Sequence, residues 1–161
     1  MKTLITALVA VAGLTVTSTP VDAGGGHHHH RVELTSGHFQ TLPGGADYHI
    51  NGGAVMVRSD RNGGRTAVFV HISGLDPDRS YPTHVHNQPC SFDPPGGSHY
   101  QNVIGGPADA VNEIWPTIST GRRGGGYGFA THGARARDDA MSIVVHNPDN
   151  TSIRLACLDL T

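Results

Sequence analysis

The chain has 161 residues, enough for one domain with a single hydrophobic core and too few for two ordinary domains. Its only lysine is Lys2, and the part from residue 24 onward carries ten Arg against twelve Asp plus Glu, a formal charge of −2. A nucleic-acid-binding protein would show a basic stripe, so this balance excludes nucleic acid as the expected partner.

The first residues have the pattern of a secretory signal peptide. Lys2 supplies a positive start, residues 4–14 are mostly apolar, and Ala23 places a small residue at the cleavage point. The apolar run is too short for a membrane span, and no later segment is a candidate. We therefore expect a signal peptide over residues 1–23 and a secreted, periplasmic or cell-envelope protein. Residues 24–36 are expected to form a flexible His-rich arm.

From residue 37 onward, short β-type runs alternate with turn signals. Val68, Val70 and Ile72 alternate strictly within residues 66–73, and Asn62-Gly63-Gly64 separates that run from residues 54–58, which predicts a hairpin. Further strands are expected at 125–131, 141–146 and 152–158. No window has a sustained helical period, so the fold class is all-β, a Greek-key barrel or sandwich over residues 37–161. The segment 87–126, rich in Gly and Pro, is expected to be a functional loop.

Two histidines share one expected strand. His84 and His86 are two residues apart, so both rings point to the same face and can bind one metal ion. His99 follows two glycines, and His146 ends an apolar run before a turn. Four imidazoles without a thiolate favour copper. A His-x-His pair alone, however, is more often surface decoration than a site.

The other histidines and the two cysteines are read as follows. His71 is expected at or near the surface, whereas His38, His49 and His132 lie near turns without partners in the sequence. Cys90 and Cys157 are expected to form one disulfide, because an even cysteine count in an exported chain favours pairing. Two buried free thiols are the alternative.

Over roughly residues 53–158 the chain resembles the copper/zinc superoxide dismutase family. The matching motifs, in family order, are Gly74-Leu75, Tyr81-Pro82-Thr83-His84-Val85-His86, Cys90, Gly96-Gly97-Ser98-His99, Val144-Val145-His146 and Arg154-Leu155-Ala156-Cys157. The resemblance implies that copper is bound by His84, His86, His99 and His146. It also implies the Cys90–Cys157 disulfide and a role for Arg154 in steering and holding the anionic substrate. An ordinary surface arginine is the alternative for Arg154.

The zinc ligands of that family are missing. Ile104 stands where the family has its first zinc histidine, and Gly106 stands three residues before Asp109, where it has the second. Asp109 and His99 alone do not make a four-ligand zinc site, so zinc is not expected and the chain resembles the copper-only branch. A carboxylate must then orient His99 in place of zinc, and Asp109 and Glu113 are both candidates. Either acid could instead be a solvated loop residue.

The implied reaction is the copper-dependent disproportionation of superoxide to dioxygen and hydrogen peroxide. His99, as proton carrier, and Arg154 are the expected catalytic residues. A non-catalytic copper-storage or copper-delivery protein on the same fold is the alternative. The tract His27, His28, His29 and His30 has three interpretations: a tag remnant, an inert segment or, as we prefer, an arm that gathers copper. The sequence predicts no oligomeric state.

Overall fold

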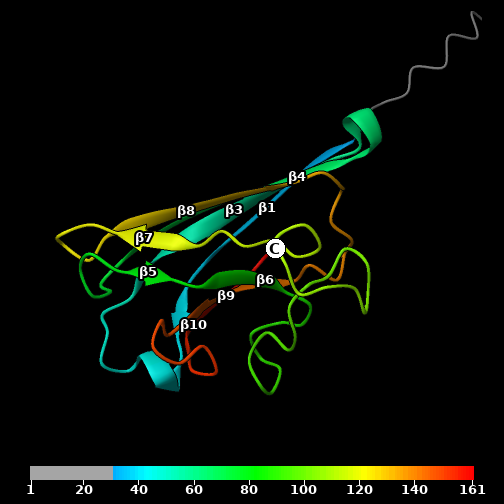
Figure 1. The fold of residues 1–161 in the computed structure, drawn as a ribbon. Coiled ribbons are helices and arrows are strands. Elements are labelled where there is room, and N and C mark those ends of the chain that lie inside the picture. Colours follow the sequence, from blue (N-terminus) through cyan, green and yellow to red (C-terminus); the bar gives the residue numbers. More distant parts are fainter. Residues whose placement is uncertain (1–30) are drawn as a thin grey trace, which may run out of the picture.

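The computed structural model describes residues 31–161, so the predicted signal peptide and the His27–His30 tract lie outside the described residues. Two antiparallel sheets stack as a β-sandwich, with β8, β3 and β4 in one layer and β6, β9 and β10 in the other (Figure 1). The six-stranded sheet has the order β1 (Val32–His38), β3 (Asn51–Ser59), β4 (Arg65–Ser73), β8 (Gly126–His132), β7 (Ile118–Thr120) and β5 (Ser80–Tyr81). The four-stranded sheet has the order β2 (Gln40–Thr41), β10 (Arg154–Asp159), β9 (Ser142–His146) and β6 (Thr83–His86). The helical segments within 31–161 are two short 3-10 turns, η1 (Pro43–Gly45) and η2 (Arg61–Gly63).

The all-β prediction and the predicted hairpin are confirmed. Strands β3 and β4 pair antiparallel along their whole length, and β8, β9 and β10 lie within two residues of the expected ranges. Strand β1 was not predicted, and it shortens the expected flexible arm, since residues 32–36 belong to the sheet. The reason is that β1 is an edge strand held by its hydrogen-bond ladder to β3, and it buries little apolar surface of its own.

The core lies between the two sheets. The alternating side chains of β4 that the sequence singled out, Val68, Val70 and Ile72, all face inward. They belong to one apolar cluster with Ile143 and Val145 of β9, and both of these are fully buried. Period-two alternation therefore sets which face of each strand meets the core.

The two sheets differ on their outer faces. Every residue of β9 is buried, although alternate residues point away from the core. The long segment after β6 covers that face, and the disulfide Cys90–Cys157 ties it to β10. A hydrogen bond from the Cys90 amide to Asp159 Oδ1 (2.7 Å) adds a second tie. The expected disulfide is therefore present, and the segment predicted as a loop also contributes β7.

Two features bear on the compartment. Within residues 31–161 there is no helix that is both long and apolar enough to cross a membrane. The disulfide is compatible with an extracellular protein, because disulfides persist in oxidising compartments.

Candidate metal centre

Strand register brings three histidines to the covered outer face of the four-stranded sheet. His84 lies opposite Val144, and His86 lies opposite Ser142. His146 is two residues from Val144 on the same strand, so its ring shares that face. The sheet therefore supplies a fixed platform of three imidazoles.

The fourth histidine comes from the covering segment. His99 forms an isolated β-bridge with His86, which holds the loop beside the strand. Gly96 and Gly97 make the approach possible, since both have positive φ (86° and 66°). A Cβ at Gly96 would lie 2.7 Å from Cγ2 of Val144, so a larger residue there would push the loop away.

The four rings converge on one point. One ring nitrogen from each of His84, His86, His99 and His146 lies within 4.8 Å of the others. The sequence had predicted these four as ligands, and the structure brings all four together. Such spacing allows a single metal ion to contact all four rings.

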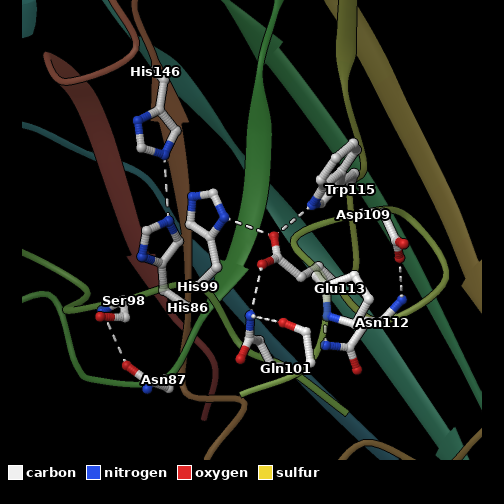
Figure 2. Close-up of polar contacts among 12 residues, drawn as sticks. His86, Asn87, Ser98, His99, Gln101, Asp109, Asn112, Glu113, Trp115 and His146 are labelled. Carbon is white, nitrogen blue, oxygen red and sulfur yellow. Dashed lines mark hydrogen bonds and ion pairs between the residues drawn. The ribbon is translucent and has the colours of Figure 1, made fainter. Parts of the chain in front are cut away.

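Hydrogen bonds decide which nitrogens are free to bind. His146 Nδ1 donates to the carbonyl oxygen of Thr151 (2.7 Å), and His86 Nδ1 lies 3.3 Å from the carbonyl oxygen of Gly97. A carbonyl oxygen only accepts, so each Nδ1 carries the proton and each Nε2 carries a lone pair. The two Nε2 atoms nevertheless face each other at 3.3 Å (Figure 2). Two facing lone pairs are favourable only with a cation between them.

His84 adds a second observation that fits a bound cation. Its Nδ1 is buried and has no hydrogen-bond partner among the described residues. A buried polar atom without a partner costs free energy, so native structures rarely leave one unpaired. A metal ion among the four rings would satisfy this atom, and the residues present therefore fit such an ion.

Burial keeps the imidazoles in the form that binds metals. The pKa of His84 is lowered to about 3 and that of His86 to about 2, with burial as the largest cause and repulsion from His99 as the next. Burial also lowers the pKa of His146 to about 4, against the hydrogen bond to Thr151, which raises it. The three rings are therefore neutral near pH 7, with lone pairs available for coordination.

Glu113 orients the ring of His99. Its Oε2 accepts a hydrogen bond from His99 Nδ1 (2.7 Å) and another from Trp115 Nε1 (2.8 Å), as Figure 2 shows. Gln101 Nε2 donates to Oε1 of the same carboxylate (3.3 Å). Glu113 is only 2% exposed, so it is a buried acid with three donors. The bond to Nδ1 leaves His99 Nε2 free for an ion.

The other acidic candidate has a different partner. Asp109 Oδ1 accepts from the backbone amides of Val111 and Asn112, which closes a turn (Figure 2). Ile104, which the sequence resemblance had aligned with a zinc histidine of the dismutase family, is 80% exposed. Between the two acids that the sequence left open, the contact with His99 therefore belongs to Glu113.

Arg154 lies directly opposite His146 across β9 and β10. Its guanidinium donates to the carbonyl oxygens of Pro95 and Gly97, so it also fastens the loop that carries His99. Burial lowers the pKa of Arg154 from the ordinary arginine value, and an arginine guanidinium stays charged in proteins. Arg154 and His99 line one shallow surface hollow together with Asn87 and Ser98. A small anion in this hollow would meet a fixed positive charge.

Sequence reasoning missed Trp115 and the two carbonyl groups that hold the rings. Trp115 is the only tryptophan of the chain and stands two residues after Glu113, a spacing that could have drawn attention to it. The carbonyls of Gly97 and Thr151 leave no side-chain signal. No protein-family model and no curated protein matches this chain.

Proposed function

We propose that the chain is a copper-dependent superoxide dismutase of the copper-only type, on a Greek-key β-sandwich. The observation that carries the proposal is the convergence of four histidine nitrogens within 4.8 Å. The buried Nδ1 of His84, which has no hydrogen-bond partner among the described residues, supports it. Imidazole ligands without a thiolate suit copper, and the hollow beside them carries the charge of Arg154. The resemblance of the sequence to the dismutase family supports the same assignment.

In the proposed centre His84, His86, His99 and His146 hold the copper ion. Copper, when bound, supplies one-electron chemistry: one superoxide is oxidised to dioxygen, and a second, with two protons, is reduced to hydrogen peroxide. Glu113 holds the proton on His99 Nδ1, which directs Nε2 toward the ligand cluster. His99 lines the hollow and its side chain is 33% exposed, so Nε2, when it is not bound to the ion, is the atom that would take up a proton and deliver it.

Arg154 supports turnover rather than storage alone. Its positive charge lies beside the hollow that His99 also lines, and it would attract superoxide to that hollow. Zinc is not part of the proposal, because Ile104 offers no donor atom and the carboxylate of Asp109 is used by backbone amides. The exported location expected from the N-terminal sequence agrees with the disulfide.

The test is superoxide decay by stopped flow, with the full chain loaded with Cu²⁺. We expect decay far above that of the copper-free chain, lost on chelation and recovered when copper returns. His84→Gln is the decisive variant, because it keeps His27–His30 and every surface histidine while removing one ligand. His49→Gln, an exposed residue outside the cluster, is the matched control.

Two outcomes would contradict the assignment. Tight copper binding with decay no faster than that of the copper-free chain would indicate the alternative, a copper-storage or copper-delivery protein. Equal activity of His84→Gln and the wild type would place the active copper outside the four-histidine cluster.

A further inference from the structure

A second pair of histidines lies on the outer face of the other sheet. His38 ends β1 and His71 lies on β4, and both are paired in register with Gly53 of β3. Side chains at directly paired positions point to the same face, so the two imidazoles flank the glycine from opposite sides. Both rings are exposed.

Gly53 leaves a gap between the rings. A Cβ at this position would lie 3.5 Å from Nδ1 of His38 and 3.5 Å from Cε1 of His71. These two atoms are therefore no farther apart than twice that distance. The carbonyl oxygen of Gly37 lies 2.6 Å from the same point. Gly53 is buried even though its position faces outward, so neighbouring groups cover it.

The rings are free to close on a ligand. Neither imidazole has a hydrogen bond to another described residue, and the rings lie beside one shallow hollow lined also by Ser36 and Phe69. No arginine or lysine lines this hollow, so no positive charge there opposes a cation. Zinc and copper bind imidazole nitrogen at about 2 Å, a distance that small rotations of two exposed rings can reach.

We propose that His38 and His71 form a second cation site over Gly53, for a divalent transition-metal ion such as Zn²⁺ or Cu²⁺. The two imidazoles are its protein ligands, and water completes the coordination. The site is on the far outer face from the four-histidine cluster, and it does not depend on the function proposed above.

The test uses the ring ¹⁵N signals of histidine in the labelled full chain, titrated with Zn²⁺. Because each signal belongs to one residue, binding at the four-histidine cluster or at His27–His30 does not obscure the result. We expect the signals of His38 and His71 to shift together at one Zn²⁺ concentration. His38→Gln should abolish the shift of His71, and His71→Gln should abolish that of His38.

His49→Gln serves as the control, because His49 is exposed and is not part of the pair. It should leave both shifts unchanged. Backbone amide signals of β3 and β4 report whether each variant keeps its fold. The proposal is overturned if neither ring responds to Zn²⁺, or if one ring still shifts at the same concentration after the other has been replaced.

Discussion

The outer faces of the two sheets both carry histidines, yet they have different chemistry. On the four-stranded sheet a disulfide-tied loop covers the face, buries His86 completely and provides oxygen acceptors for the rings. On the six-stranded sheet the face is open, with Phe129 64% and Tyr127 68% exposed and with His38 and His71 unbonded. In both sheets, successive side chains of a strand point alternately toward the core and toward the outer face.

The comparison shows what the loop after β6, here called the cover, does to the histidines of the strands beneath it. It fixes the protonation and the orientation of their rings. Burial keeps the rings neutral, and the carbonyls and Glu113 choose which nitrogen carries the lone pair. The exposed pair has neither constraint, so any ion it holds must order the rings itself. We therefore expect tight binding under the cover and weaker binding on the open face.

The largest effect should come from releasing the cover. Replacement of both cysteines in Cys90→Ala/Cys157→Ala opens a covalent loop of sequence separation 67 and should lower the free energy of unfolding by about 4 kcal/mol. Urea denaturation of the copper-free chain measures this loss. Reduced wild-type protein is the control and should show a similar loss. Equal unfolding midpoints for the oxidised and reduced wild type would contradict the role given to the disulfide.

The next effect concerns orientation of a ring beneath the cover. Glu113→Gln keeps the size of the side chain but removes the charge that accepts from His99 Nδ1 and Trp115 Nε1. Loss of such a supporting partner typically weakens metal affinity about 10–100-fold. Competition for Cu²⁺ against a chelator of known affinity measures the change. Asp109→Asn is the matched variant and should bind copper like the wild type; an equal loss in both would refute the distinction between the two acids.

A smaller effect is expected from the charge beside the centre. Arg154→Ala removes the positive charge from the hollow and should lower the rate of superoxide decay about tenfold at low ionic strength. Arg154→Lys keeps the charge but cannot bridge the carbonyls of Pro95 and Gly97 as a planar fork does. A rate near that of the wild type in Arg154→Lys would assign the effect to charge. Copper content measured in parallel shows whether the loop has moved instead.

The smallest effect belongs to the open face. His71→Gln should leave superoxide decay and copper affinity at the four-histidine cluster unchanged, because the two outer faces are separated by the whole core. The same stopped-flow and competition measurements check this. A clear loss of activity in His71→Gln would show that the two histidine groups are coupled.

Much of the fold and of the candidate site could be predicted from the sequence. Alternation at Val68, Val70 and Ile72 located β4, because side chains in a strand point alternately to two faces. Strand β1 was not predicted, because an edge strand held by backbone hydrogen bonds needs no strict apolar pattern. Spacing and resemblance together selected all four histidines of the cluster. Glu113 could not be separated from Asp109, because the choice depends on the path of the loop.

The sequence alone determined the alternation of apolar residues that makes the strands. It also determined which side chains are available for a disulfide and a metal site: two cysteines, and histidines placed beside glycine or at strand ends. Tertiary structure alone decided which groups meet. It paired Glu113 with His99, turned the Nε2 atoms of His86 and His146 toward each other, and set His38 beside His71 across Gly53. The physical reason is that strand register and loop path bring together residues that are distant in the sequence. The alternation of apolar and polar residues along one strand does not specify those contacts.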